Sequence, residues 1–448
     1  MSIVKGQTLV SSERKLTIQV QEKLGEGGQG EVFRAVEANR TYALKWYNPS
    51  QATPDQKRAI AALVKHGRPR GEAGSRFLWP IDLVEDPLSG RFGYLMQLMD
   101  TKQFASLGEI QAHRKPAPSY GTMCRISFLA ASSYKRLHME GYCYRDISRR
   151  NLLFNPLNGD IFICDNDNVG IEGQSSCQVM GTMENMPPEL ILNRAEPSTK
   201  SDLHALSVLL FELWIWHHPM HGLKEFCVRS WDLPAKVRIY GEEPLFVFDP
   251  EDDSNRLPDD PDYNTARKRW EQCPKIIKDL FIKAFTVGLH NPDQRVTEGE
   301  WQRAFLRLLD GMLYCPHCGA ENLWTMELTS CPCWHCHTEL LSDRQSALPP
   351  RLVIKHPTRG TYHFSLLLGK KLSTLFTNPE EEEKARLFGE VTQHPTNPQI
   401  WGIRNLTQTP WRATFPDGSR KMVEPERAAP LTIGIKLDFD GFSGEIVA

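Results

Sequence analysis

The segment Tyr144–Asn151 has the sequence YRDISRRN, and the other informative features of the chain stand at fixed distances from it. Its Asp146 is followed five residues later by Asn151, and apolar residues flank the segment. An aspartate in this setting can orient the proton of an attacking hydroxyl group, while the asparagine holds a magnesium ion on the phosphates. The segment is weak evidence on its own, so its meaning depends on what stands at fixed distances around it.

Downstream of this segment, two acidic residues stand at informative distances. Asp165, the first aspartate of the sequence ICDND, lies nineteen residues after Asp146. Glu189, the last residue of GTMENMPPE, follows another twenty-four residues later. A second carboxylate near Asp146 would offer the hard oxygen ligand that magnesium prefers beside substrate phosphates.

Upstream, a glycine-rich stretch precedes a strand-like stretch. Residues 24–33 read LGEGGQGEVF, and such glycines let a hairpin backbone approach phosphate groups closely. Residues 42–46 read YALKW, which alternates like a strand and contains Lys45. Either feature alone would be an ordinary turn or an ordinary surface lysine, but their joint occurrence favours a phosphate-binding site.

In order and spacing, these features resemble the protein kinase family over about residues 16–309. The resemblance implies an α+β, bilobal fold, with an N-lobe over about 16–99 and a C-lobe over about 100–309. It also implies ATP and magnesium as cofactors and a protein as the substrate.

The same resemblance assigns roles to individual residues. Asp146 would be the catalytic base, Asn151 and Asp165 the magnesium ligands, and Lys45 the cation that neutralises the ATP phosphates. The hinge between the lobes would bind the adenine edge through its backbone. The residues expected to contact ATP are therefore Gly25, Gly27, Gly28, Gly30, Val32, Lys45, Gln97 and Met99.

One departure from the family pattern concerns the partner of Lys45. The family's third helix should supply a glutamate, but no Glu occurs between Lys45 and Gly71. The nearest is Glu72, which follows Pro69 and Gly71 and lies outside the helical pattern. Either Glu72 pairs with Lys45, or the lysine is held in a different way.

Two further departures lie close to the catalytic segment. The histidine of the family is replaced by Tyr144, and its Asp-Phe-Gly sequence is replaced by Asp165, Asn166 and Asp167. Asp167 is therefore a second candidate for the metal ligand. Asp165 is preferred, because its spacing from Asp146 matches the family.

Features of the substrate site and of the regulatory segment resemble different kinase classes. Thr182 resembles the serine/threonine arrangement, whereas Arg150 resembles the tyrosine-kinase arrangement. We expect serine or threonine as the substrate residue. Ser175 and Ser176, in the segment 169–180, offer hydroxyl groups that phosphorylation can modify.

Three residues have expected structural roles. Asp202 should accept hydrogen bonds from backbone N–H groups of the catalytic segment, because one carboxylate can accept two such bonds. Arg295 should form an ion pair with Glu189, as the closing arginine of the large lobe does in the family.

Five of the eleven cysteines crowd into residues 315–336. Four of them form two C-x2-C pairs separated by fourteen residues, a spacing that places four thiolates around a zinc ion. Cys331 is surplus, and His335 or His337 can replace a cysteine ligand. This pattern predicts a structural zinc ribbon over 310–340, with ligands Cys315, Cys318, Cys333 and Cys336.

The C-terminal part alternates short apolar runs with turn residues. Residues 341–350 are predicted to form a linker and residues 351–448 a small all-β sandwich. Gly369, His394 and Asn405 follow one another in an order similar to a forkhead-associated domain, where they would contact a phosphothreonine. The alternative is a sandwich that binds partners without recognising phosphate.

Composition and charge limit the classes of partner. A chain of 448 residues with 53 basic and 55 acidic side chains has no general electrostatic attraction to nucleic acid or membrane. The N-terminus lacks an apolar signal sequence, and the apolar run 206–216 is too short to span a bilayer. We expect a cytoplasmic protein without nucleic-acid or membrane partners; a nucleic-acid-binding ribbon would need a basic face around 310–340.

The whole arrangement resembles bacterial serine/threonine kinases encoded beside a PP2C-type phosphatase and a von Willebrand A-domain protein, which the resemblance implies as partners. The first hypothesis is an active kinase that phosphorylates protein substrates, itself included. The second is a pseudokinase scaffold that binds nucleotide without phosphoryl transfer. The missing helix glutamate supports the second hypothesis, whereas the joint presence of Lys45, Asp146, Asn151 and Asp165 supports the first.

Overall fold

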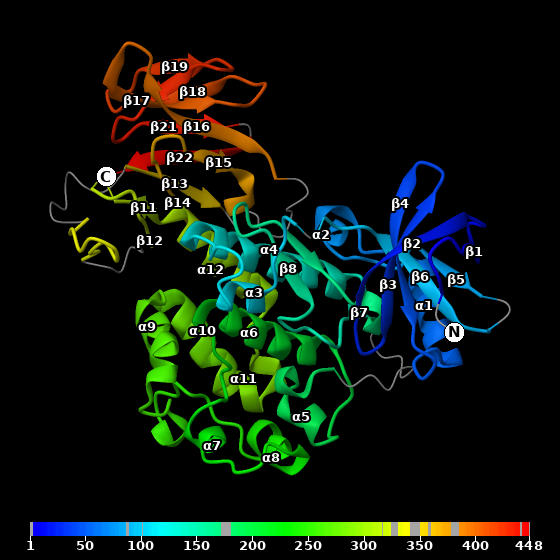
Figure 1. The fold of residues 1–448 in the computed structure, drawn as a ribbon. Helices are drawn as coiled ribbons and strands as arrows, with labels where there is room; N and C mark the ends of the chain where they lie inside the picture. The colour runs from blue at the N-terminus through cyan, green and yellow to red at the C-terminus, as the bar shows by residue number, and fades with distance from the viewer. Residues whose placement is uncertain are drawn as a thin grey trace. The chain divides into compact units, whose positions relative to one another are not determined.

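The computed structural model describes residues 3–86, 89–100, 102–171, 181–315, 317–323, 330–340, 350–356, 360–377, 385–439 and 441–447 (Figure 1). The chain divides into two compact units. The first comprises Met1–Pro118 and Leu129–Trp301, and the second comprises Ser119–Phe128 and Gln302–Ala448.

The first unit begins with six strands that close into an antiparallel barrel, in the order β1-β2-β3-β4-β6-β5. Alternate residues of β2, such as Ile18 and Val20, point into a core that also contains Leu44, Trp46 and Leu95. The strands are β1 (Thr8–Ser11), β2 (Thr17–Glu26), β3 (Gly30–Glu37), β4 (Arg40–Tyr47), β5 (Asp82–Glu85) and β6 (Phe92–Gln97).

Two helices lie between β4 and β5 in the chain. Helix α1 (Pro54–His66) begins where the Thr53 side chain accepts a hydrogen bond from the Gln56 N–H group, and it ends at Gly67, which has a φ of 80°. Helix α2 (Gly71–Ser75) contains the exposed Glu72. The glutamate considered as a partner for Lys45 therefore lies on the surface, outside α1.

Helices dominate the remainder of the first unit. Helix α6 (Thr199–Ile215) is buried along almost its whole length, which explains its continuous apolar sequence. The catalytic segment, Tyr144–Asn151, connects β7 (Tyr142–Cys143), which pairs with β10 (Gly170–Ile171), to β8 (Leu152–Phe154), which pairs with β9 (Ile161–Ile163). The other helices of the first unit are α3 (Leu107–Gln111), α5 (Pro188–Ile191), α7 (Leu223–Phe226), α8 (Leu233–Val237), α9 (Asn264–Gln272), α10 (Lys275–Phe285) and α11 (Val287–His290). Helices α4 (Tyr120–Met139) and α12 (Glu298–Asp310) are each divided between the two units.

Several single-turn helices complete the secondary structure. They are η1 (Asn166–Asn168), η2 (Met183–Asn185), η3 (Arg238–Glu242), η4 (Asp253–Asn255), η5 (Pro261–Tyr263), η6 (Pro292–Gln294) and, in the second unit, η7 (Thr374–Phe376).

The second unit contains a two-stranded sheet and two larger sheets. A six-stranded sheet has the order β14-β13-β22-β21-β18-β19, and a four-stranded sheet has the order β15-β16-β17-β20. The strands are β11 (Met312–Tyr314), β12 (Glu321–Leu323), β13 (Arg351–His356), β14 (Gly360–Ser365), β15 (Lys371–Ser373), β16 (Leu387–His394), β17 (Asn397–Asn405), β18 (Trp411–Thr414), β19 (Arg420–Val423), β20 (Ala428–Pro430), β21 (Lys436–Phe439) and β22 (Phe442–Val447).

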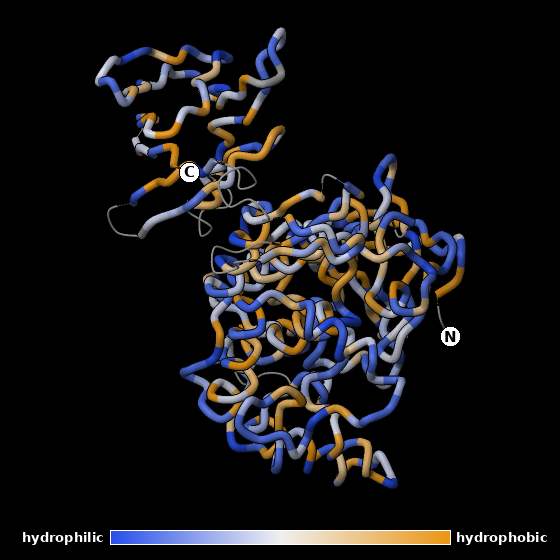
Figure 2. Tube along the Cα trace, turned by 90° about the vertical axis from the view of Figure 1, so that its left-hand side faces the viewer, coloured by the Kyte–Doolittle hydropathy of each residue, from blue (hydrophilic) through white to orange (hydrophobic). Residues whose placement is uncertain are grey.

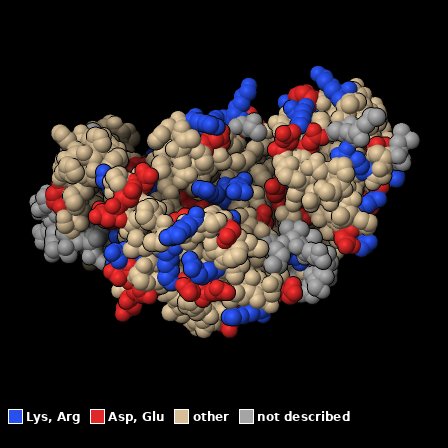
Figure 3. All heavy atoms as spheres, turned by 60° about the horizontal axis from the view of Figure 1, so that its bottom comes forward, with Lys and Arg blue, Asp and Glu red and all other residues tan. Residues whose placement is uncertain are grey.

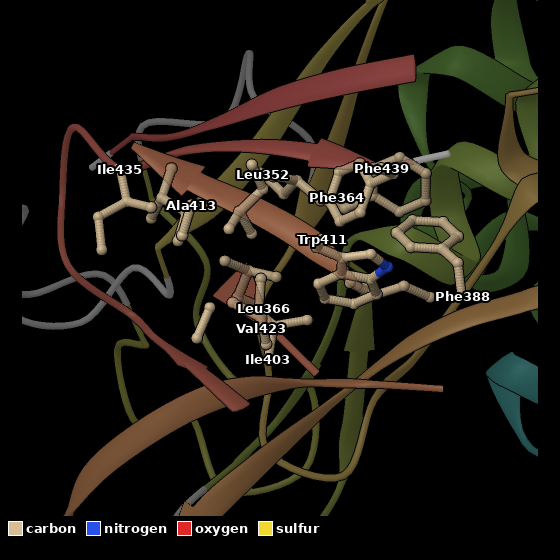
Figure 4. Close-up of a cluster of buried hydrophobic side chains, with 14 of the residues drawn as sticks. Leu352, Phe364, Leu366, Phe388, Ile403, Trp411, Ala413, Val423, Ile435 and Phe439 are labelled. Atoms are coloured by element: carbon tan, nitrogen blue, oxygen red, sulfur yellow. The ribbon is translucent and has the colours of Figure 1, made fainter. Parts of the chain in front are cut away.

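The two larger sheets share one hydrophobic core (Figure 4). Phe364 and Trp411 enter it from the six-stranded sheet, and Phe388 and Ile403 enter it from the four-stranded sheet. The Trp411 ring lies 4.8 Å from the Phe439 ring in an edge-to-face arrangement that favours aromatic packing. Two sheets joined in this way form a sandwich-like body.

Hydrophobic and hydrophilic residues alternate along much of the trace, as Figure 2 shows. Among the residues that the structure describes, no helix is both long enough and apolar enough to cross a membrane. Basic and acidic side chains are interspersed on the face drawn in Figure 3, which agrees with a formal net charge of -2.

Candidate active site

The backbone of the catalytic segment is held by Asp202, at the start of α6. Its Oδ1 atom accepts a hydrogen bond from the Arg145 N–H group at 2.9 Å, and its Oδ2 atom accepts one from the Tyr144 N–H group. Arg145 has a φ of 71°, a left-handed conformation that a non-glycine residue adopts only when its surroundings enforce it. The predicted role of Asp202 is confirmed.

His138, near the end of α4, supports Asp202 from the other side. Its Nε2 atom lies 3.0 Å from Asp202 Oδ2, and its Nδ1 atom lies 2.5 Å from Glu298 Oε1. Burial lowers the pKa of His138, but hydrogen bonds to the two carboxylates outweigh burial and raise the pKa to about 9. No sequence pattern predicts this pairing, because His138, Asp202 and Glu298 are far apart in the chain.

Asp146 has a fixed orientation. Its Oδ1 atom accepts hydrogen bonds from the Thr182 N–H group and the Thr182 hydroxyl group, both at 2.9 Å. Its Oδ2 atom accepts one from Asn151 Nδ2 at 3.0 Å, and that amide group also donates to the Asp146 backbone oxygen at 2.9 Å. Burial raises the pKa of Asp146, while the Thr182 and Asn151 hydrogen bonds oppose the rise. This carboxylate can therefore orient a hydroxyl group and accept its proton.

Asn151 and Asp165 each carry an oxygen atom of the kind that binds a cation. The Asn151 amide nitrogen donates to Asp146, so the amide oxygen is the atom of this group that can bind a cation. Asp165 follows β9 with a left-handed backbone, at φ 52° and ψ 48°, and its side chain is 51% exposed. A carboxylate and an amide oxygen fit the donor set that magnesium takes beside phosphates.

Lys45, in β4, is buried and lies within contact distance of two carboxylates. Its Nζ atom lies 2.8 Å from Asp167 Oδ2 and 3.2 Å from Asp165 Oδ1. It also donates a hydrogen bond to Gln29 Oε1 at 2.6 Å. Burial lowers the pKa of Lys45, but the two carboxylates outweigh burial and raise it. The lysine is thus held differently from the family pattern, and not by Glu72.

The glycine-rich stretch forms the turn between β2 and β3. Gly27 and Gly30 exchange backbone hydrogen bonds, at 2.8 and 3.3 Å. A methyl group added at Gly30 would lie 2.2 Å from the Trp46 backbone oxygen, so this glycine is required by the sheet itself. Methyl groups added at Gly25, Gly27 or Gly28 would meet nothing within 4 Å, so these three glycines leave open space. Such space suits close approach of a phosphate chain to the backbone.

The other expected ATP contacts lie on neighbouring strands. Val32 pairs with Lys45 across β3 and β4, and Gln97 ends β6 opposite Tyr42 of β4. Met99 follows β6 and is partly buried. The structure therefore brings Val32 next to Lys45 and places Gln97 and Met99 where the barrel strand ends.

Glu189 and Arg295 form the expected ion pair. Arg295 Nη1 lies 2.8 Å from Glu189 Oε1, and Arg295 Nη2 lies 2.9 Å from Glu189 Oε2, which is a bidentate arrangement. This prediction is confirmed. Ser175 and Ser176 lie outside the residues that the structure describes.

The four predicted cysteine ligands converge in the second unit. Their sulfur atoms all lie within 4.8 Å of one another, and the pairs Cys315–Cys336 and Cys318–Cys333 are each separated by 3.6 Å. Four thiolates around one zinc ion, each about 2.3 Å from it, would be spaced in this way. Cys331 stands apart from this group and is buried beside Leu313.

Comparisons with known proteins bear on the first unit. The protein kinase domain family matches residues 18–302. The serine/threonine-protein kinase PknL of Mycobacterium tuberculosis is 25% identical over 229 residues, which are 49% of this chain and 54% of that protein. The serine/threonine-protein kinase SCH9 of Candida albicans is 27% identical over 212 residues, 44% of this chain and 25% of that protein.

A third relative extends the match along the chain. Mitogen-activated protein kinase kinase kinase 7 of Drosophila melanogaster is 24% identical over 297 residues, 63% of this chain and 36% of that protein. The chain thus spans about half the length of PknL, at 54%, and smaller parts of the other two. Because the family match covers more than half of the 448 residues, the chain belongs to the protein kinase domain family.

Proposed function

We propose that the protein is an ATP- and magnesium-dependent protein kinase that phosphorylates serine or threonine side chains, including its own. The observation that carries this proposal is the environment of Asp146. Thr182 and Asn151 fix both of its oxygens, and burial raises its pKa. A carboxylate oriented in this way is suited to receive the proton of a substrate hydroxyl group.

ATP would bind between the glycine-rich turn and Lys45. The open space at Gly25, Gly27 and Gly28 supports close approach of the phosphates, and the Lys45 ammonium group would neutralise their charge. Gly30 and Val32 would shape the same turn. The backbone of Gln97 and Met99 would bind the adenine edge.

Asn151 and Asp165 would hold magnesium. The ion would supply charge neutralisation on the phosphate oxygens. The two residues fit this role. Asn151 uses its amide nitrogen to donate to Asp146, so its amide oxygen can face a cation, and the Asp165 carboxylate is partly exposed. Burial is the largest cause that raises the pKa of Asp146, and the negative charge of Asp165 adds to that rise.

In the transfer step, the substrate hydroxyl oxygen attacks the γ-phosphorus atom. The bond between that phosphorus atom and the β,γ-bridging oxygen breaks, ADP leaves, and the hydroxyl proton passes to Asp146. Positioning and charge stabilisation supply most of the rate enhancement in such reactions.

Serine or threonine specificity is supported by Thr182. Its hydroxyl and N–H groups both donate to Asp146, so the segment that begins at Gly181 is tied to the catalytic carboxylate. A segment anchored there would hold the acceptor hydroxyl group near Asp146. The named serine/threonine kinases among the relatives agree with this choice.

We also propose the domain organisation that the sequence predicts. It comprises a kinase domain over 16–309, a zinc ribbon over 310–340, a linker over 341–350 and a β-sandwich over 351–448. Zinc would be held by Cys315, Cys318, Cys333 and Cys336 and would stabilise a segment too small for its own core. The ribbon and the sandwich would recognise partners in the cytoplasm. The PP2C-type phosphatase and the von Willebrand A-domain partner rest on the sequence resemblance alone.

Lys370, which directly follows Gly369, is engaged within the second unit, which argues against a phosphopeptide contact through its side chain. Its ammonium group donates to the Asp310 backbone oxygen at 3.0 Å and to the Asp310 carboxylate. Asn405 donates to the backbone oxygens of Thr409 at 2.8 Å and Val423 at 3.0 Å. Because both side chains serve the unit itself, a forkhead-associated-like fold would bind partners here through other residues.

The pseudokinase alternative loses its main support in this site. The missing helix glutamate favoured it, but Lys45 has two carboxylate partners in the structure. The contacts of Lys45 with Asp165 and of Asn151 with Asp146 also support the active-kinase hypothesis, because they keep these four side chains in two adjoining pairs.

The test separates binding from chemistry in two variants. Asp146→Asn should still be stabilised by ATP with magnesium in a thermal melt, but its transfer of γ-phosphate should fall by about a hundredfold or more. Asp165→Asn should lose both the transfer and the magnesium dependence of ATP binding. The exposed Asp160, changed to Asn, is the matched control. Undiminished transfer by Asp146→Asn would refute the assignment of the base.

A further inference from the structure

Asp167 occupies an unusual position for a residue of the catalytic region. Its side chain is completely buried, and its Oδ2 atom lies 2.8 Å from Lys45 Nζ. The Tyr47 hydroxyl group donates a hydrogen bond to the same oxygen. In the part of the chain that the structure describes, Oδ1 is buried without a hydrogen-bond partner. The charge of this carboxylate therefore depends on Lys45 for compensation.

Helix α1 faces this pair with a neutral side chain. Gln56 Nε2 donates to the Tyr47 hydroxyl oxygen at 3.1 Å and to the Asp167 backbone oxygen at 3.2 Å. Gln56 is buried in the first turn of α1, where its N–H group also bonds to the Thr53 side chain. The helix thus contributes hydrogen bonds to the pair and no charge.

Asp165 differs from Asp167 in the two properties that matter for a permanent counter-ion. Its side chain is 51% exposed, and its contact with Lys45 is longer, at 3.2 Å. An exposed carboxylate gains little from an ion pair, because water screens the attraction. Asp165 can therefore exchange its contact with Lys45 for a cation at low cost, whereas buried Asp167 cannot.

We propose that Asp167 is the permanent counter-ion that positions Lys45 for ATP, in place of a helix glutamate, with Tyr47 and Gln56 as its supports. This inference rests on the proposed kinase function and divides the two aspartates between two tasks. Asp165 binds the cation that accompanies ATP, and Asp167 keeps the lysine ammonium group directed at the phosphates. Asp167 is a positioning residue, because it acts through Lys45.

This arrangement also gives α1 a defined part in the site. Because Gln56 bonds to both the Tyr47 hydroxyl group and the Asp167 backbone, a shift of α1 would disturb the counter-ion without breaking an ion pair. Neutral hydrogen bonds cost less to break than charged ones. The position of Lys45 is thus set mainly by the segment Asn166–Asn168 and only secondarily by the helix.

Steady-state kinetics of the full chain tests the proposal. Asp167→Asn should raise the KM for ATP by about tenfold or more with a smaller change in kcat, whereas Asp165→Asn should mainly lower kcat and change the magnesium dependence. Asp160→Asn is the control, because Asp160 is exposed on the loop between β8 and β9. An unchanged KM in Asp167→Asn would overturn the proposal. A change of magnesium dependence in Asp167→Asn alone would overturn it too, because Asp167 would then be the metal ligand.

A second test moves the negative charge from position 167 to position 56 and measures ATP affinity. Recovery of affinity would not be expected if Asp167 had only a structural role. In the Asp167→Asn background, Gln56→Glu places a carboxylate beside the Tyr47 hydroxyl group and should recover part of the lost ATP affinity. Gln56→Glu in the wild-type background should not improve ATP affinity. Absence of recovery in the double variant, when the protein is folded, would count against charge as the reason for the defect.

Folding of the variants is measured in parallel by thermal melts. If Asp167→Asn alone is unstable, Lys45→Met combined with Asp167→Asn should be more stable than either single variant, because no uncompensated buried charge remains. Additive losses would overturn the pairing. If the wild-type chain transfers no phosphate, the proposed function fails, while ATP-induced stabilisation of the wild type and its loss in Asp167→Asn still decide the role of Asp167.

Discussion

At the residue scale, His138 links the catalytic segment to the end of the first unit. It lies between Asp202 and Glu298, and the two carboxylates raise its pKa to about 9 despite its burial. Asp202 accepts hydrogen bonds from the N–H groups of Tyr144 and Arg145, which directly precede Asp146. The charge on His138 therefore stabilises the backbone conformation that positions Asp146.

The pKa of His138 predicts how stability depends on pH. Its folded pKa, about 9, lies above the ordinary value of 6.5, so its contribution is fully present below pH 6.5 and is lost as the pH rises through 9. His138→Gln should therefore reduce the free energy of unfolding by about 3 kcal/mol near pH 6 and by much less above pH 9. Urea unfolding of both proteins at the two pH values measures this difference. An equal loss at both pH values would show that His138 acts by packing and not by charge.

At the element scale, the C-terminal end of α12 is tied to the sheets of the second unit. The Asp310 carboxylate accepts hydrogen bonds from the Ser365 N–H group, at 3.1 and 3.3 Å to its two oxygens. It also forms a largely buried ion pair with Lys370. Burial raises the pKa of Asp310, and Lys370 opposes this rise. The pair satisfies two groups that would otherwise be costly to bury.

Removal of either Asp310 or Lys370 should therefore lower the stability of the second unit. Asp310→Ala leaves Lys370 buried without its counter-ion and should destabilise the second unit by about 3–5 kcal/mol. Hydrogen exchange should show reduced protection in β14, which ends at Ser365, and in β15, which begins directly after Lys370. The exposed Asp438, changed to Ala, is the control in the same unit. Equal protection in the two variants would contradict a stabilising role for the pair.

Elements also show what the sequence could predict. The family resemblance predicted that Asp202 binds the backbone of the catalytic segment, and the structure has this contact; Asp146 and Asn151, five residues apart in that segment, are hydrogen-bonded to each other, while their roles stay predictions. The partner of Lys45 was not predictable, because η1 must approach β4 in three dimensions before Asp167 can reach the lysine. The contact of Lys370 with Asp310 was not predictable for the same reason, because the two residues lie sixty positions apart in the chain.

At the scale of the whole molecule, two residues beside the cysteine cluster, Glu321 and Trp334, contact the start of α4 in the second unit. Glu321 Oε2 accepts a hydrogen bond from the Gly121 N–H group at 3.0 Å, near the N-terminus of α4. Trp334 donates to the Glu321 backbone oxygen at 2.8 Å and packs against Tyr120 at 6.2 Å. A carboxylate at a helix N-terminus satisfies free N–H groups there.

Removal of the proposed zinc should thus affect more than the ribbon. A chelator should lower the melting temperature and make the four ligand thiols reactive toward a thiol reagent, because metal binding and folding of such segments are coupled. Cys318→Ser should reproduce the lower melting temperature, whereas the exposed Cys227, changed to Ser, should not. Purified protein without bound zinc and without a response to the chelator would rule out a structural metal here.

Phosphate transfer by this chain, with Asp146 as the base, is the reaction on which the proposed roles of the other site residues depend. Its most direct measurement is the incorporation of labelled γ-phosphate from ATP with magnesium by the purified full chain, followed by phosphoamino acid analysis, with Asp146→Asn beside it. We predict phosphoserine or phosphothreonine in the wild type and none above background in the variant. Equal incorporation in both proteins, or none in a wild type that ATP stabilises, would contradict the claim.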